Sequence, residues 1–278
     1  MNMEIRYAAH PQDVKSYDTA RLRAEFHSGN LMVSGEINLV YTHYDRFIYG
    51  GVFPVWEPLS LPNYDALKAD YFLERRELGI INVGWKGKVT VDGEEFELQN
   101  LDVLYIGKGK KEITFESIDP NSPAKFYLNS SPAHQSFPTV KATKEDANIV
   151  DLGTQVAANK RTIYQFIHED GIQSCQLVMG VTELKAGNIW NTFPPHTHDR
   201  RMEVYFYFDL PNDQIVMHFM GQPQETRHLA VKNEEAVISP PWSIHAGAGT
   251  SNYKFIWGMA GENKSFSDMD GVPLQDVL

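Results

Sequence analysis

Two histidines and a glutamate in the second half of the sequence have a spacing that can hold a metal ion. His196 and His198 are separated by one residue, and Glu203 follows five residues after His198. On a strand, residues i and i+2 point to the same face, so the two imidazoles would project side by side. Across a turn or bulge, Glu203 can return to the same centre. Neutral imidazoles and a carboxylate are ligands for zinc and for other transition metals.

A fourth candidate ligand, His245, lies at the end of a proline-rich segment. Pro240 and Pro241 would end one strand and direct the following residues inward. Three neutral histidines and one carboxylate leave a divalent cation with net positive charge, which can polarise a carbonyl group. The remaining histidines have no partner at ligand spacing and are expected to be solvated or hydrogen-bonded: His10, His27, His43, His134, His168, His218 and His228.

Several polar residues near these motifs are candidates for binding a substrate. Counting by twos from Glu203 puts Arg201, Tyr205 and Tyr207 on one face of a strand, where they can line a barrel or only pack. Arginine binds carboxylates bidentately, which suits an anionic substrate. The candidates for binding a carboxylate of such a substrate are Arg161, Arg201 and Arg227. The candidates for binding its hydroxyl groups are Gln176, Asn191 and Gln222. No residue is assigned as the catalytic base.

The elements that must position these side chains are predicted to be short strands. The strand candidates are rich in Val, Ile, Tyr, Phe and Thr, and glycines punctuate them. Asp92-Gly93 between two of them predicts a tight hairpin. Helical periodicity is confined to Pro11 to Phe26 and Lys144 to Ala147. Strands without alternating helices indicate an all-β sandwich or barrel. The candidates are 37–44, 47–55, 78–83, 88–91, 103–106, 174–182, 204–209, 215–220, 226–231, 236–239 and 253–258.

A weak internal repeat predicts two domains of similar design. The run 73–81 resembles the run 199–207, and setting Glu77 against Glu203 gives an offset of 203 − 77 = 126 residues. The segment 132–148 contains prolines and charged residues and is the expected linker. We therefore expect an N-terminal domain at 1–140 and a C-terminal metal-binding domain at 141–278.

The first domain is expected to hold no metal. At the 126-residue offset, Asp70 and Phe72 stand in place of the two histidines, so Glu77 has no co-ligands there. The expected role of this carboxylate is an ion pair with the neighbouring Arg75 or Arg76.

Composition excludes several kinds of partner. Lys+Arg 25 against Asp+Glu 36 gives 25 − 36 = −11, which argues against general nucleic-acid binding. A single cysteine, Cys175, excludes an internal disulfide. The sequence has no run of 18 apolar residues and no apolar signal segment near the start, so we expect a cytoplasmic protein with no membrane partner.

The motif of His-x-His, four residues, Glu and a distant Pro-rich segment ending in His resembles the two metal-binding motifs of the cupin superfamily. Longer runs resemble the 5-keto-4-deoxyuronate isomerase family over nearly the whole chain. The typical second cupin motif has a glycine three residues before the histidine, where this sequence has Trp242. The runs are 72–79, 102–109 and 123–127 in the first half, and 190–192, 196–208, 220–228 and 255–259 in the second.

This resemblance implies a bicupin, with two jelly-roll β-barrel domains, a few short helices and one Zn²⁺ per subunit in the second barrel. It implies an aldose–ketose isomerase of pectin breakdown that converts 5-dehydro-4-deoxy-D-glucuronate to 3-deoxy-D-glycero-2,5-hexodiulosonate through a metal-stabilised enediolate. It also implies a homo-oligomer, a hexamer, whose partner is a small keto-uronate. Two alternatives are an Fe(II)-dependent cupin dioxygenase, which shares the ligand pattern, and a non-enzymatic sugar-binding cupin, against which the four intact ligands speak. The long family-specific runs favour the isomerase.

Overall fold

The computed structural model, which describes residues 3–278, consists of two compact units. The first contains the segment up to Arg6, Asn30–Ala147 and Phe166–Met179, and the second contains Tyr7–Gly29, Asn148–Gln165 and Gly180–Leu278. The units follow the expected order of halves, but a linear division at residue 140 describes only the main body of each. An early segment belongs to the second unit, and a segment after residue 165 belongs to the first.

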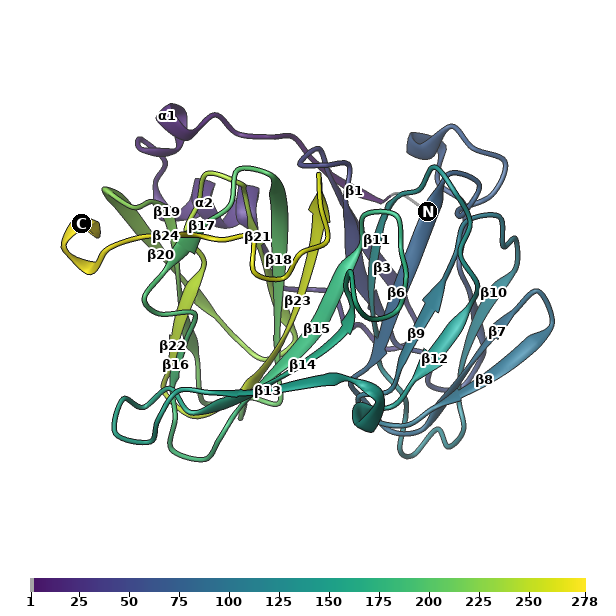
Figure 1. Cartoon of the computed structure of the whole chain (residues 1–278). Coiled ribbons are helices and arrows are strands. Elements are labelled where there is room, and N and C mark those ends of the chain that lie inside the picture. Colours follow the sequence, from purple (N-terminus) through teal and green to yellow (C-terminus); the bar gives the residue numbers. More distant parts are fainter. Residues whose placement is uncertain (1–2) are drawn as a thin grey trace. The chain divides into compact units, whose positions relative to one another are not determined.

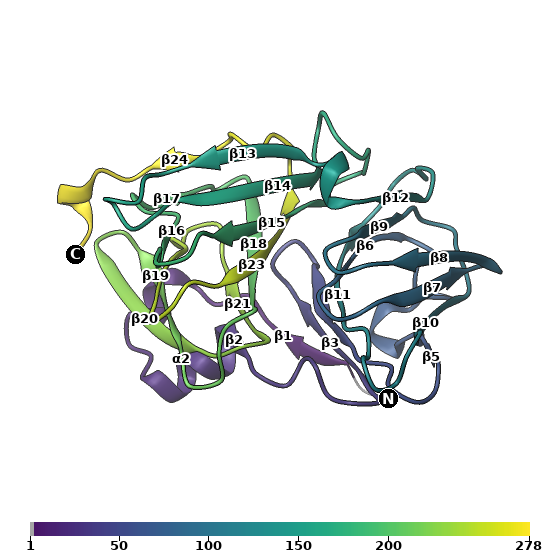
Figure 2. The ribbon, with the colours of Figure 1, turned by 90° about the horizontal axis from the view of Figure 1, so that it is seen from below.

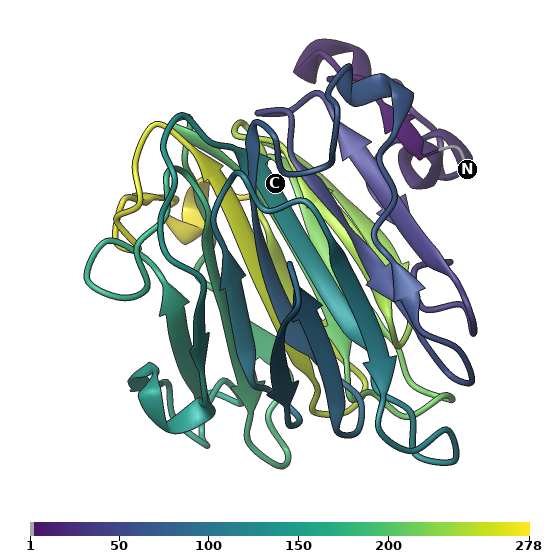
Figure 3. The same cartoon turned by 90° about the vertical axis from the view of Figure 1, so that its right-hand side faces the viewer.

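The first unit is built from two β-sheets. A seven-stranded sheet has the order β1-β3-β4-β11-β6-β9-β12, and a four-stranded sheet has the order β5-β10-β7-β8 (Figure 1). In Figure 3 the blue strands β7 and β8 lie nearer to the viewer than the seven-stranded sheet of the first unit. The strands are β1 (Glu4–Arg6), β3 (Ile37–Thr42), β4 (Ile48–Val52), β5 (Leu59–Ser60), β6 (Arg76–Asn82), β7 (Gly87–Val91), β8 (Glu94–Leu98), β9 (Val103–Ile106), β10 (Ile113–Ser117), β11 (Phe126–Pro132) and β12 (Val140–Ala142).

Apolar side chains from both sheets form the core of the first unit. All residues of β6 and β9 are buried, and Leu78 and Ile80 join one cluster with Phe115 of the other sheet. The predicted hairpin is confirmed, since β7 and β8 pair in antiparallel register across Asp92 and Gly93. Their φ angles of 47° and 85° are both left-handed, which suits the Asp-Gly pair.

The second unit repeats this design. Its seven-stranded sheet has the order β13-β14-β15-β23-β18-β21-β2, and its four-stranded sheet has the order β16-β22-β19-β20, with a separate pair β17-β24 (Figure 2). The strands are β2 (His27–Ser28), β13 (Asn148–Leu152), β14 (Arg161–Ile167), β15 (Val178–Leu184), β16 (Trp190–Asn191), β17 (His196–Thr197), β18 (Arg201–Phe208), β19 (Val216–Gln222), β20 (Glu225–Val231), β21 (Glu235–Ser239), β22 (Ala246–Gly249), β23 (Lys254–Gly261) and β24 (Asp270–Gly271).

Strand β18 is the central support of the second unit. It pairs with β23 on one side and with β21 on the other, and all eight of its residues are buried. A strand held on both edges is rigid, so the alternate side chains of β18 point in fixed directions. Glu203 and Tyr205 lie on this strand.

Helices are few and short. They are α1 (Pro11–Val14), α2 (Thr19–Phe26) and the 3₁₀ helices η1 (Asp65–Leu67), η2 (Lys144–Asp146) and η3 (Leu274–Asp276). Asp18 caps α2 by accepting a hydrogen bond from the Arg21 backbone N–H at 2.8 Å. Within residues 3–278, none of these helices has the length and apolar character needed to cross a membrane.

Candidate metal centre

The four predicted ligands converge at one point of the second unit. The turn at Asp199–Arg200 follows β17 and returns the chain along β18, so Glu203 faces the two histidines before it; His245 stands just before β22. One nitrogen or oxygen atom from each of the four side chains lies within 4.8 Å of the others. Glu203 Oε2 is 3.2 Å from His198 Nε2 and 3.0 Å from His245 Nε2, which is 2.9 Å from His196 Nε2.

The hydrogen bonds behind the cluster show that it suits a metal ion. His198 Nδ1 lies 2.9 Å from the Arg201 backbone carbonyl, which can only accept, so Nδ1 carries the proton and the neutral ring turns its Nε2 lone pair toward Glu203. His245 Nδ1 lies 3.1 Å from Ser239 Oγ, a hydroxyl that can accept the proton of this ring. Lone pairs that face one another are stable when a cation lies between them. Tetrahedral zinc separates its nitrogen ligands by roughly 3.4 Å, close to the spacing here.

Burial and neighbouring groups shift the pKa of His196 and of Glu203. Desolvation lowers the pKa of His196 to about 2, with a further contribution from His245, so this ring is neutral at physiological pH. Burial raises the pKa of the Glu203 carboxyl, whereas positive charge and N–H donation from His245 and His198 hold it below its usual range; a bound cation would supply that positive charge when the rings are neutral. Neutral imidazoles and an ionised carboxylate are the forms that bind a metal.

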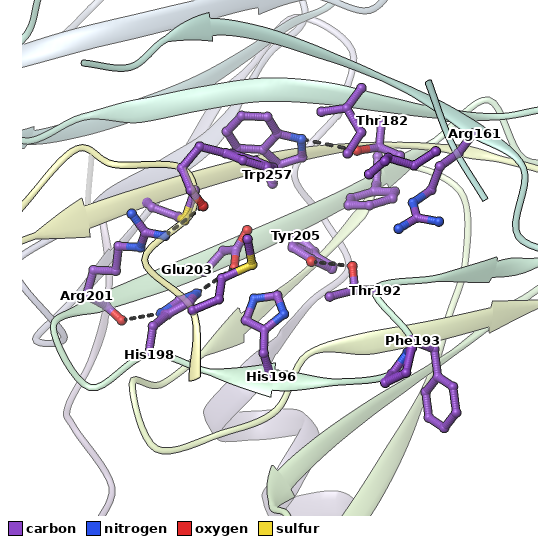
Figure 4. A pocket seen from close by; sticks show the side chains of 17 residues that line it. Arg161, Thr182, Thr192, Phe193, His196, His198, Arg201, Glu203, Tyr205 and Trp257 are labelled. Atoms are coloured by element: carbon purple, nitrogen blue, oxygen red, sulfur yellow. Dashed lines mark hydrogen bonds and ion pairs between the residues drawn. The ribbon is translucent and has the colours of Figure 1, made fainter. Parts of the chain in front are cut away.

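His196, His198 and Glu203 of this cluster line a cavity of about 270 Å³. This volume is near the lower end of the range for metabolite pockets, about 300 to 1,000 Å³. Two hydroxyl groups of the wall are already paired: Thr192 Oγ1 lies 2.9 Å from Tyr205 OH, and Thr182 Oγ1 accepts a hydrogen bond from Trp257 Nε1 at 3.2 Å (Figure 4). Burial raises the pKa of Tyr205 well above 10, so this phenol keeps its proton. Apolar side chains make up most of the rest, among them Leu152, Ile163, Phe193, Pro194, Phe255, Met259, Phe266 and Met269.

A segment near the C-terminus, residues 263–271, contributes Phe266 and Met269 to this wall; we call it the strap. The Arg201 guanidinium donates to the backbone carbonyls of Ser265, Phe266 and Asp268. Arg200 binds the Asp268 carboxylate at 2.6 Å and that of Asp270 at 2.6 Å. Arg201, one of the three arginines predicted to bind a carboxylate, therefore uses its guanidinium to fix the strap.

The other predicted substrate-binding residues are placed differently from one another. Arg161 lines the cavity. Asn191 is buried behind the wall, where its amide donates to Tyr253 OH at 2.7 Å. Gln222 and Arg227 lie at a separate small hollow, where Arg227 pairs with Glu225 at 2.9 Å. Gln176 belongs to the first unit.

The expectation for Glu77 is wrong. No ion pair joins Glu77 to Arg75 or Arg76 among residues 3–278, because both guanidinium groups donate elsewhere, chiefly to backbone carbonyls. The buried Glu77 carboxylate accepts five hydrogen bonds of 2.7 to 2.9 Å instead. The donors are the hydroxyls of Tyr105 and Ser131 and the backbone N–H groups of Cys175, Gln176 and Leu177.

Together, the two jelly-roll units and the cluster of three histidines and one glutamate, the one such cluster among residues 3–278, define a bicupin with a candidate metal centre. Solved structures with this fold include an IolB-like protein from Salmonella typhimurium LT2 (TM-score 0.73, 15% identity, 89% of this chain and 96% of that chain). Another is the oxalate decarboxylase of Lactobacillus farciminis (TM-score 0.55, 9% identity, 82% of this chain and 79% of that chain).

The model of the KduI/IolB family matches residues 28–272, and the chain belongs to this family. Similar curated proteins are named 4-deoxy-L-threo-5-hexosulose-uronate ketol-isomerase. The protein from Formosa agariphila is 59% identical over 274 residues, which cover 99% of this chain and 98% of that protein. The protein from Halalkalibacterium halodurans is 58% identical over 275 residues, which cover 99% of this chain and all of that protein, at 100%.

Proposed function

We propose that this protein is a metal-dependent ketol-isomerase that converts 4-deoxy-L-threo-5-hexosulose uronate, also called 5-dehydro-4-deoxy-D-glucuronate, to 3-deoxy-D-glycero-2,5-hexodiulosonate. The observation that carries the proposal is the convergence of His196, His198, Glu203 and His245, in a chain of this family, at a cavity that the first three of them line. The full-length similarity to proteins named for this reaction supports the choice of substrate.

The reaction moves the carbonyl group from C1 to C2 of the aldose. A proton leaves C2 and one is added at C1, while the hydroxyl proton of O2 is lost and O1 gains one. A divalent cation held by the four ligands supplies positive charge beside the oxygens where negative charge develops. The protonated phenol of Tyr205, fixed by Thr192, would donate a hydrogen bond to one of these oxygens.

We propose Zn²⁺, one per subunit, as the bound metal. The donor set of three imidazole nitrogens and one carboxylate oxygen suits zinc, and the reaction involves no net redox change. A role in pectin breakdown, a homohexameric assembly and a cytoplasmic location belong to the same proposal and rest on the family resemblance.

The test is conversion of freshly prepared keto-uronate, followed by NMR with purified protein before and after chelation. We expect product to form, chelation to abolish its formation and added Zn²⁺ to restore it. No conversion by metal-replete protein would contradict the isomerase proposal. Oxygen uptake with Fe(II) would then support the dioxygenase alternative.

A further inference from the structure

The strongest unassigned feature of the cavity is the Arg161 guanidinium. Arg161 begins β14 and lines the cavity, and its side chain makes one hydrogen bond, from Nη1 to the Asn159 backbone carbonyl at 2.9 Å. No carboxylate pairs with it within residues 3–278. A guanidinium has five N–H donors, so most of the donor capacity of Arg161 is not used by the residues that the structure describes.

The partial burial of this charge is not compensated by a carboxylate among the described residues. Desolvation lowers the pKa of Arg161, and the ionisable groups that face it are the hydroxyls of Tyr205 and Tyr253, which are neutral at physiological pH. An arginine remains protonated under these conditions, so Arg161 brings to the cavity a positive charge that no carboxylate of residues 3–278 contacts. An anionic ligand would supply the missing charge.

The two arginines of the cavity wall have different tasks. The Arg201 guanidinium is bound to three strap carbonyls, whereas that of Arg161 is directed toward Tyr205 and Thr192 (Figure 4). Figure 4 shows Arg161 and Arg201 on opposite sides of the cavity, with His198 near Arg201. One available guanidinium matches a carboxylate with a single charge, whereas a phosphate dianion usually requires further cations.

We infer that Arg161 binds the substrate carboxylate and thereby orients the sugar acid, with its aldehyde end toward the cluster of three histidines and one glutamate. This inference rests on the proposed function and adds the direction in which the substrate lies. It also makes Arg161 the residue that selects uronates over neutral sugars. A ligand held by charge-assisted bidentate hydrogen bonds is expected to bind about 10- to 100-fold more tightly than one that offers an uncharged group at the same place.

The test compares the free keto-uronate with its C6 methyl ester, which keeps the carbon chain and removes the charge. For the metal-replete wild type we expect kcat/KM for the acid to exceed that for the ester by about 10- to 100-fold. Arg161→Met should abolish this preference, mainly by raising KM for the acid. Arg161→Lys should keep part of it, and Arg21→Met, which alters an exposed guanidinium on α2, should keep all of it.

Calorimetric titration of the same two compounds separates this inference from the proposed function, because it needs no turnover. If the wild type binds the acid more tightly than the ester and Arg161→Met does not, Arg161 is the carboxylate site even if no isomerisation occurs. An unchanged preference for the acid in folded Arg161→Met protein, or a wild type that binds both compounds equally, would overturn the inference. Thermal unfolding of each variant shows whether it is folded.

Discussion

Glu77 of the first unit and Glu203 of the second lie at corresponding positions, but their carboxylates have different partners. Both are buried on a central strand, β6 or β18. The carboxylate of Glu203 faces imidazole nitrogens, whereas that of Glu77 accepts five hydrogen bonds from hydroxyl and backbone donors. A buried carboxylate is stable only when its charge is balanced, and these two units balance it by different means.

This difference shows what a cupin unit can do without a metal. Phe72, at the position corresponding to His198, is buried and packs edge-on against Tyr64, with ring centroids 6.4 Å apart. The side chain at position 72 is therefore part of an apolar core, and the Glu77 carboxylate binds the backbone N–H groups of residues 175–177 instead. The second unit is therefore expected to carry the chemistry, and the first to contribute stability.

The largest effect is expected from Glu203→Gln, which removes the carboxylate of the candidate metal centre in the second unit. The neutral amide replaces the one charged ligand, so the protein should lose its metal and about 10³-fold or more in kcat/KM. Atomic emission on purified protein and the NMR assay measure the two quantities. Near-normal turnover by metal-free Glu203→Gln protein would show that the cluster is not the catalytic centre.

Glu77→Gln should lower the stability of the protein without changing its metal content or its activity. Replacing one carboxylate oxygen by an amide nitrogen leaves buried donors without an acceptor, so the free energy of unfolding should fall by about 2–4 kcal/mol. Metal content and kcat/KM of the folded protein should not change. Urea denaturation measures the effect, and Glu95→Gln is the control, because its carboxylate is exposed and pairs only with Lys88. Loss of metal from Glu77→Gln would contradict the separation of roles.

The double variant Asp70→His/Phe72→His asks whether the first unit can be converted. We expect the ratio of metal to chain to stay unchanged, because the Glu77 carboxylate is already saturated with hydrogen bonds. Placing a polar ring in the core should lower the free energy of unfolding by about 2–4 kcal/mol. A second equivalent of metal per chain would show instead that only the histidines are missing.

Two serines provide the finest comparison, since each lies beside one of the glutamates on a paired strand. Ser239 is opposite Glu203 and contacts His245 Nδ1, while Ser131 is opposite Glu77 and donates to its carboxylate. Ser239→Ala should weaken metal binding by about 10- to 100-fold. Ser131→Ala should lower stability by about 1 kcal/mol and leave metal binding unchanged. Metal titration and urea denaturation are made on both variants. Weaker metal binding by Ser131→Ala, or unchanged metal binding by Ser239→Ala, would contradict this comparison.

The metal cluster and much of the fold can be predicted because their signals are local in the sequence. The expected strand 103–106 coincides with β9, and the Asp-Gly hairpin has the predicted turn. His196, His198 and Glu203 lie within eight residues of chain, and the turn between β17 and β18 brings them together as expected. His245 was identifiable from its proline-rich segment.

Interactions with backbone groups that are far away in the sequence cannot be predicted from a local sequence pattern. The N–H groups that bind Glu77 are 98 to 100 residues away, and backbone donors have no side-chain pattern. Arg201 and Arg161 look equally suitable in sequence, and only the strap carbonyls distinguish them. The assignment of residues 7–29 and 166–179 to the opposite units also depends on tertiary contacts.

The strap bears on how this pocket can change in evolution or by engineering. Arg201 holds it through backbone carbonyls, so these bonds require no particular side chain at residues 265, 266 or 268. The side chains of Phe266 and Met269 meet the cavity, while the Arg201 carbonyl orients His198 independently of them. New substrate preferences can therefore arise by substitution of Phe266 and Met269 while the four candidate metal ligands keep their positions.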